Sequence, residues 1–178
     1  MNIVWRESAN PDTYEAARLS RVFNGRCPQR FPLAVVQVTS ESDVLTATKL
    51  AELHNCRIAV RSGGHSFPVW SVQDDSILID LGGFKVLDVD EEKRIAKVSP
   101  SVTSKELNDA LIEKHGLMFP GGHCPDVGLG GFLLQGGMGW NCRVGFFIFL
   151  PCVFASIFFS NRFRTGAGRA RESMPWRW

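Results

Sequence analysis

The placement of glycine constrains this chain more than any other feature of its sequence. Eight of its 17 glycines lie in "PGGHCPDVGLGGFLLQGGMGW", residues 120–140, and two adjacent glycines interrupt "VRSGGHS", residues 60–66. Glycine has no Cβ, so it is used where a backbone adopts positive φ or approaches a ligand closely. The two stretches therefore predict two tight loops, which are either plain turns or the walls of a binding site.

Bulk composition restricts the class of protein. At 178 residues, 44% hydrophobic and 21% charged, the chain predicts one globular domain or a fragment of a larger protein. A net charge of +2, without a basic stripe and interleaved aromatics, argues against nucleic acid as a partner. The N-terminus lacks an apolar run of signal-peptide length, which predicts a cytoplasmic location. The five cysteines are irregularly spaced, so we expect no disulfide framework or structural zinc, and buried thiols by default.

Local patterns before the first loop predict a mixed α and β arrangement. Ser40-x-x-Asp43 is a capping-box pattern followed by apolar residues at helical spacing, which predicts a helix over 41–54. Short apolar runs at 57–61 and 76–81 predict strands. Strand, helix and strand then form a βαβ unit whose second strand leads directly into the first glycine pair.

The segment between the two loops predicts a hairpin and a second helix. In "FKVLDVDEEKRIAKVSP", residues 84–100, two alternating runs are joined by a polar turn at 91–93. Thr103-x-x-Glu106 then caps a helix, and Gly116 is placed to end it.

The first glycine loop has the chemistry of an anion site. A strand that ends in Arg-Ser-Gly-Gly-His offers several backbone N–H groups to one concavity. A pyrophosphate would fit there, because Gly63 and Gly64 allow close approach and Arg61 can supply charge-assisted hydrogen bonds. A plain turn with a solvated histidine is the alternative.

The second loop adds a second reactive side chain. His123 and Cys124 lie within it, so the two loops together deliver two nucleophiles, His65 and Cys124. The side chains of His65, His123 and Cys124 could also bind zinc, but a fourth ligand at sensible spacing is missing.

Three motifs together carry a family resemblance. "AVRSGGHS", "GGFKVLDVD" and "PGGHCPDVGLGGFLLQGGMGW" resemble the PCMH-type FAD-binding domain of the vanillyl-alcohol oxidase superfamily, specifically its berberine-bridge-enzyme-like oxidases, over about residues 31–142. The resemblance implies an α+β fold, in which an N-terminal βαβ subdomain precedes part of a second α+β subdomain. In that family the histidine after the double glycine bonds to the 8α-methyl carbon of FAD, and the cysteine of "GHCxxVGxGG" bonds to C6. Those positions are His65 and Cys124.

The resemblance also implies the other cofactor contacts. Around the pyrophosphate we expect Arg61, Ser62, Gly63, Gly64 and Ser66. Facing the flavin and its ribityl chain we expect Val127, Gly128, Gly130 and Gly131.

The implied activity is that of an FAD-dependent oxidoreductase. Hydride would pass from a substrate C–H to flavin N5, with O₂ as the acceptor that reoxidises the flavin, and with an alcohol, a sugar or a secondary metabolite as the small-molecule substrate. The catalytic base of relatives comes from later parts of the chain, so the sequence indicates no catalytic residue here. Tyr14 is expected to be structural.

Beyond Val144 the sequence departs from the family. We therefore divide the chain into an N-terminal extension at 1–30, an incomplete FAD-binding domain at 31–143, and an aberrant apolar then basic tail at 144–178. The apolar run at 145–159 contains Pro151 and is shorter than the roughly 20 residues that a spanning helix needs, which argues against membrane insertion. Exposed apolar surface and aggregation are the expected result.

A shifted reading frame accounts for the tail. Residues 165–178, "TGAGRARESMPWRW", can be encoded by codons that give "WGWACERVDAVEV" when read from the third nucleotide, and family members continue with a "WGWACE"-like segment. A retained intron near 144–162 followed by out-of-frame sequence would produce this pattern. The alternative to an oxidase is therefore an inactive mis-spliced or mis-annotated fragment with at most the capacity to bind FAD.

Overall fold

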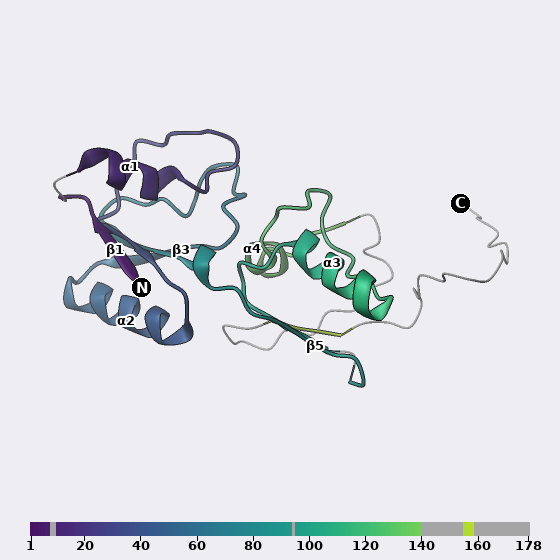
Figure 1. The fold of residues 1–178 in the computed structure, drawn as a ribbon. Coiled ribbons are helices and arrows are strands. Elements are labelled where there is room, and N and C mark those ends of the chain that lie inside the picture. The colour runs from purple at the N-terminus through teal and green to yellow at the C-terminus, as the bar shows by residue number, and fades with distance from the viewer. Residues whose placement is uncertain (8–9, 94, 140–154, 159–178) are drawn as a thin grey trace, which may run out of the picture.

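The chain folds into two sheets with helices around them (Figure 1). This computed structural model describes residues 1–7, 10–93, 95–139 and 155–158. The N-terminal part forms a four-stranded sheet, and a 3-10 turn, η1 (Leu81–Gly83), leads from it to a second part with a three-stranded sheet. The described architecture is therefore the predicted α+β fold of two successive subdomains.

The first sheet is mainly parallel. Its strands are β1 (Asn2–Trp5), β2 (Ala34–Gln37), β3 (Arg57–Arg61) and β4 (Ser76–Asp80), in the order β1-β2-β4-β3. The last three are parallel and β1 is antiparallel to β2. The predicted βαβ unit is present, with β3 as its second strand and with β2, for which no strand was predicted, as its first. Strand β4 lies between the two. All five residues of β4 are buried, as expected for a central parallel strand covered on both faces.

Helix α2 (Glu41–Leu53) covers one face of this sheet, as the sequence predicts. Its Ala47 and Ala51 pack against alternate residues of β2 and β4. The Ser40 hydroxyl accepts from the amide of Asp43 at 3.3 Å. The Asp43 carboxylate accepts instead from the amide of Thr39 at 2.8 Å, so the reciprocal half of the capping box is displaced by one residue. The amide and the hydroxyl of Thr39, which both donate to this carboxylate, hold the pKa of Asp43 below its usual range.

Helix α1 (Pro11–Leu19) covers the opposite face (Figure 1). Asn10 caps it by accepting from two first-turn amides, and Pro11 opens it at a position that needs no N–H donor. The buried Tyr14 hydroxyl donates to the Pro32 carbonyl at 2.7 Å, and burial raises the pKa of this phenol. Through β1 and this helix, residues 2–5 and 11–19 share the sheet and core of the residues beyond 31. The segment that the sequence sets apart as an extension thus shares the core of the first subdomain.

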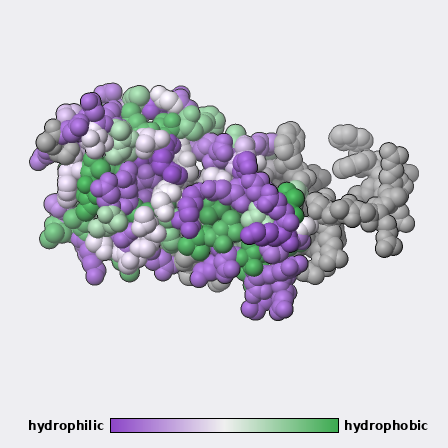
Figure 2. Space-filling view, viewed as in Figure 1, coloured by the Kyte–Doolittle hydropathy of each residue, from purple (hydrophilic) through white to green (hydrophobic). Residues whose placement is uncertain are grey.

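The second part carries the predicted hairpin and helix. Strands β5 (Leu87–Asp90) and β6 (Ile95–Val98) pair antiparallel, and α3 (Ser104–His115) follows. Both hydrogen bonds of the Thr103–Glu106 capping box are present, and Gly116 ends the helix with a φ of 60°. A short helix, α4 (Leu129–Leu134), packs with α3 and β6 around a separate apolar core. Apolar side chains also reach the surface, including Ile112 and Leu134. On the side of the molecule drawn in Figure 2, hydrophobic residues lie among hydrophilic ones.

Only four residues of the predicted tail are described. Strand β7 (Ala155–Phe158) pairs antiparallel with β6 as the third strand of the second sheet. Pro151 and the rest of the tail predictions, at 144–154 and 159–178, lie outside the described residues. In the described ranges no helix has both the length and the apolar character needed to cross a membrane.

The N-cap of α3 is a direct test of the second subdomain. Thr103→Ala removes an acceptor for the Glu106 amide and is expected to lower the free energy of unfolding by about 1 kcal/mol. Thr48→Ala is the matched control, because Thr48 is exposed within α2 and alanine is the better helix former there. Urea unfolding monitored by circular dichroism compares them. Equal effects would show that the cap contributes nothing.

Candidate functional site

The two glycine loops meet backbone to backbone. A Cβ built on Gly63 would overlap the amide nitrogen of Gly128, and one built on Gly128 would lie 2.6 Å from the nitrogen of Gly63 and 2.7 Å from the hydroxyl of Ser62. Any residue larger than glycine would push the loops apart. The close approach expected from the glycines is therefore, at this point, an approach of the two loops to each other.

The second loop is anchored on the start of α3. The amides of Ser104 and Lys105 donate to the carbonyls of Val127 and Pro125, at 3.2 and 2.9 Å. These are first-turn amides that have no partner within the helix. In return, the amides of Leu129 and Gly130 donate to carbonyls of the segment before α3, both at 2.8 Å.

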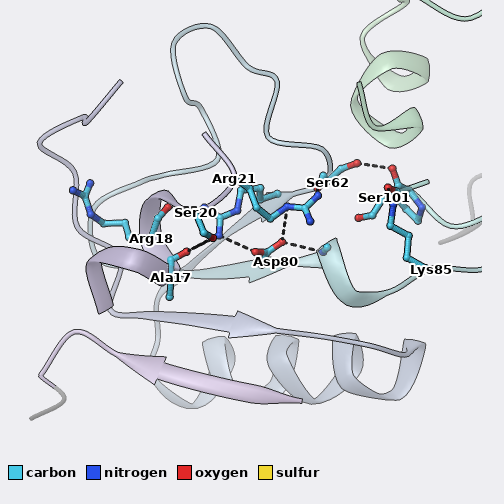
Figure 3. Close-up of polar contacts among 11 residues, drawn as sticks. Ala17, Arg18, Ser20, Arg21, Ser62, Asp80, Lys85 and Ser101 are labelled. Carbon is cyan, nitrogen blue, oxygen red and sulfur yellow. Dashed lines mark hydrogen bonds and ion pairs between the residues drawn. The ribbon is translucent and has the colours of Figure 1, made fainter. Parts of the chain in front are cut away.

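Ser62 ties the first loop to both subdomains. Its hydroxyl donates to the carbonyl of Pro100 at 2.5 Å, which links the loop to the segment that anchors Gly130. Its own carbonyl accepts from Nη2 of Arg21 at 2.5 Å (Figure 3). The loop is thus held from both sides before any ligand is considered.

A buried ion network lies under the first loop. Arg61 and Asp80 are paired residues at the ends of neighbouring parallel strands, and Nη2 of Arg61 lies 2.8 Å from the Asp80 carboxylate. The other Asp80 oxygen accepts from the amide of Gly82 at 2.9 Å and lies 3.5 Å from Nε of Arg21. Figure 3 shows Asp80 beside Arg21. Because each of these charges is largely withdrawn from water, each depends on the others for compensation.

The guanidinium of Arg61 is occupied by this network. Besides Asp80, it donates to the carbonyls of Ala17 and Arg18, at 2.7 and 2.5 Å, and the residue is 1% exposed. Its terminal nitrogens therefore face α1 and Asp80. The phosphate contact predicted for this side chain would require it to leave these acceptors.

A cavity of about 540 Å³ lies where the two loops meet. Of the residues predicted to bind the cofactor, all but Cys124 line it: Arg61, Ser62, Gly63, Gly64, His65, Ser66, Val127, Gly128, Gly130 and Gly131. Trp70, Leu81 and Phe132 are lining residues that the sequence motifs did not indicate. Tertiary structure therefore brings both predicted loops to one hollow.

The first loop contributes cavity-lining residues whose amides have no acceptor in the described part of the chain. Within the described parts of the chain, the main-chain amides of Gly63, Gly64 and His65 find no hydrogen-bond acceptor. Gly64 has a φ of +77°, and a Cβ on it would overlap the carbonyl oxygen of Arg21. Unpaired amides gathered in a loop fit an anionic group such as a phosphate.

The two predicted nucleophiles have different surroundings. His65 is half-buried and its ring stacks on Phe23, with centroids 4.5 Å apart and an interplanar angle of 9°. Cys124 is a free, exposed thiol three residues before Val127. Across the described ranges, no group of three or more histidine, cysteine or carboxylate side chains could hold a metal ion.

The default expectation of buried cysteines is wrong for two of the described thiols. Cys27 and Cys124 are exposed and Cys56 is half-buried. The exposed pair lies in loops, where a thiol has no core to pack against. Cys142 and Cys152 lie outside the described residues.

Sequence reasoning missed three residues that shape the site. Arg21, Phe23 and Asp80 contact the first loop from other parts of the chain. Only Asp80 carried a usable signal, because a carboxylate that follows three apolar residues of a buried strand must be paired. Nothing in the local pattern around Arg21 and Phe23 indicates a contact with residues 62–65.

The chain belongs to the FAD binding domain family, whose match covers residues 32–147. It is similar to FAD-linked oxidoreductase janO of Penicillium janthinellum, with 49% identity over 141 residues, covering 79% of this chain and 31% of that relative. It is also similar to aclacinomycin-N/aclacinomycin-A oxidase of Streptomyces galilaeus, with 39% identity over 123 residues, covering 68% of this chain and 22% of the oxidase.

Solved structures agree with this assignment. BBE-like 1 of Physcomitrella patens matches with a TM-score of 0.70 and 28% identity, covering 80% of this chain and 30% of that one. Aclacinomycin oxidoreductase matches with a TM-score of 0.66 and 33% identity, covering 80% and 28%. The predicted family, an FAD-dependent oxidoreductase family with berberine-bridge-enzyme-like members, is confirmed. The chain spans less than a third of the length of these relatives.

Gly64 offers a test of the loop geometry. Gly64→Ala adds both a strained positive φ and an overlap with the Arg21 carbonyl, whereas Gly25→Ala adds the strain alone, because nothing lies within 4 Å of a Cβ built there. We expect Gly25→Ala to cost about 1–2 kcal/mol in unfolding free energy and Gly64→Ala clearly more. Urea titration of both variants measures the difference. Equal losses would mean that Arg21 does not press against the loop.

Proposed function

We propose that this chain is the FAD-anchoring part of an oxidoreductase and that FAD binds in the cavity between the two glycine loops. The observation that carries the proposal is that Gly63, Gly64 and His65 line that cavity and that their amides have no acceptor among the described residues. These donors suit the pyrophosphate, since hydrogen bonds to charged acceptors are stronger than neutral ones. Ser62 and Ser66 would contribute beside them.

The second loop would form the other wall. Val127, Gly128, Gly130 and Gly131 line the cavity opposite the first loop and would face the flavin and its ribityl chain. The ring of Phe132 and the side chain of Leu81 would exclude water from this part of the site. These assignments rest on cavity lining and on the family motif.

Arg61 would act through the protein and not on the phosphate. Its guanidinium is engaged by Asp80 and by two carbonyls of α1. We assign it the role of holding the end of β3, so that the loop that follows starts from a fixed point.

We propose two covalent attachments, from His65 to the 8α-methyl carbon and from Cys124 to C6. In each, a new bond from nitrogen or sulfur to carbon replaces one hydrogen on the flavin and one on the side chain. The two hydrogens correspond to two protons and one electron pair, which reduce the flavin and then pass to O₂ to give H₂O₂. The lining position of His65 and the free, exposed thiol of Cys124 support these roles.

Bound FAD would supply oxidation of a substrate C–H by accepting a hydride, with O₂ as the proposed acceptor. For the substrate we propose a small molecule of the alcohol, sugar or secondary-metabolite class. One relative is named an oxidase of aclacinomycins. No residue of this chain is assigned as catalytic base.

A second proposal is that the chain binds FAD without turning over a substrate. It is favoured by the lining of the cavity, to which cofactor contacts are assigned but no catalytic base. H₂O₂ release from the FAD-loaded chain in the presence of alcohols or sugars would contradict it.

Comparing FAD with riboflavin tests the amide site. Riboflavin lacks the pyrophosphate, so we expect this chain to bind FAD at least about tenfold more tightly, given about 1.5–3 kcal/mol for each hydrogen bond to a charged group. Quenching of flavin fluorescence on titration gives both affinities. Equal affinities would contradict a pyrophosphate at Gly63 and Gly64.

Cysteine and histidine variants test the attachments. After acid precipitation, flavin should remain on the native chain, on His65→Ala and on Cys124→Ala, but not on the double variant. Cys27→Ala is the matched control, because Cys27 is also a free, exposed thiol. Fluorescence of the denatured protein on a gel reads the result. Flavin that stays with the double variant would refute both assignments.

A further inference from the structure

The segment Arg21–Asn24, which we call the N-terminal cradle, runs along the whole first loop. Arg21 donates to the carbonyl of Ser62, and its own carbonyl lies against Gly64. The amide of Phe23 donates to the Gly64 carbonyl at 3.4 Å. The Asn24 side chain donates to the carbonyl of Phe67 at 3.0 Å, one residue beyond the loop. The cradle therefore contacts the loop at successive points from one end to the other.

Phe23 makes the contact nearest to the proposed chemistry. Its ring is almost parallel to the imidazole of His65, with the two ring centroids 4.5 Å apart. The ring of Phe67 contacts the Phe23 ring edge to face, with a centroid distance of 5.2 Å and an interplanar angle of 84°. Among the described residues, the His65 ring has no hydrogen-bond partner. The stack on Phe23 is thus one contact that restricts rotation of this imidazole.

We propose that Phe23 is a positioning residue that holds the imidazole of His65 in the orientation needed for its bond to the flavin. The proposal rests on the attachment of His65 proposed above. Stacking covers one face of the ring and leaves its edge, with both nitrogens, available. An attacking atom held in the correct direction reacts much faster than one that must first find it.

This role separates binding from attachment. Phe23 lies outside the set of residues that line the cavity, so its loss should leave the affinity for FAD unchanged. The rate of bond formation through His65 should fall, by about fivefold if the stack has the usual strength of an aromatic pair. A merely structural role would instead lower FAD affinity and stability together.

The experiment uses a Cys124→Ala background, in which any covalent flavin must be attached elsewhere than at that thiol. Phe23→Leu, Phe23→Trp and Phe67→Leu are then compared. Phe67→Leu is the matched control, because Phe67 touches Phe23 edge-on and is itself 72% exposed. FAD is added to flavin-free protein, samples are denatured at intervals, and covalent flavin is measured by fluorescence. Noncovalent affinity is measured in parallel.

We expect Phe23→Leu to attach flavin slowly, with Phe23→Trp and Phe67→Leu close to the background rate and all affinities within about twofold. Attachment by Phe23→Leu at the background rate would overturn the proposal. If the background itself attaches no flavin, the His65 assignment fails, and the role of Phe23 fails with it. If Phe23→Leu does not fold, Phe23→Met replaces it.

A measurement without flavin tests the positioning role of Phe23 separately from the covalent attachment of His65. In the flavin-free chain, the ring current of Phe23 should shift the carbon-bound ring protons of His65 upfield in the NMR spectrum, and Phe23→Leu should abolish that shift. An unshifted His65 in the unsubstituted chain would overturn the positioning role, whatever the flavin does. A shifted His65 without attachment would place the error in the proposed bond.

Discussion

The contact between the backbones of Gly63 and Gly128 governs the geometry of the site, because it joins the loops of two different subdomains with no side chain between them. Ser62 and Pro100 reinforce the contact by a hydrogen bond. Each loop is also tied to its own subdomain, the first to the end of β3 and the second to the start of α3. The junction thus brings together the residues of both loops that line the cavity.

Charge buried beneath the junction anchors the start of the first loop. Asp80 ends the central strand and meets Arg61 from the neighbouring strand and Arg21 from the segment after α1. Three elements distant in sequence therefore converge at one carboxylate. Breaking such a group leaves uncompensated charge away from water, which is more costly than losing a surface pair. The same convergence brings the N-terminal cradle against the loop.

Much of the local structure was predictable, because its causes are local. The Thr103–Glu106 box, the Gly116 stop, the hairpin and the helix at 41–53 follow from capping, turn chemistry and periodicity, and all are found. The strand at 76–80 was predicted, but its place between β2 and β3 was not, since strand order depends on packing on both faces. The sequence predicted that the Arg61 guanidinium binds the pyrophosphate, but in the structure this guanidinium forms an ion pair with Asp80.

The sequence by itself determined where the backbone must turn tightly and which side chains lie beside those turns. Both follow from glycine spacing and short motifs, which depend only on residues that are close together in the chain. Only the tertiary structure decided that the two turns meet at Gly63 and Gly128, that Arg61 faces inward, and that Phe23 stacks on His65. These contacts join residues that are far apart in the chain or belong to different elements. Their partners are chosen by packing of the whole fold, which no local pattern records.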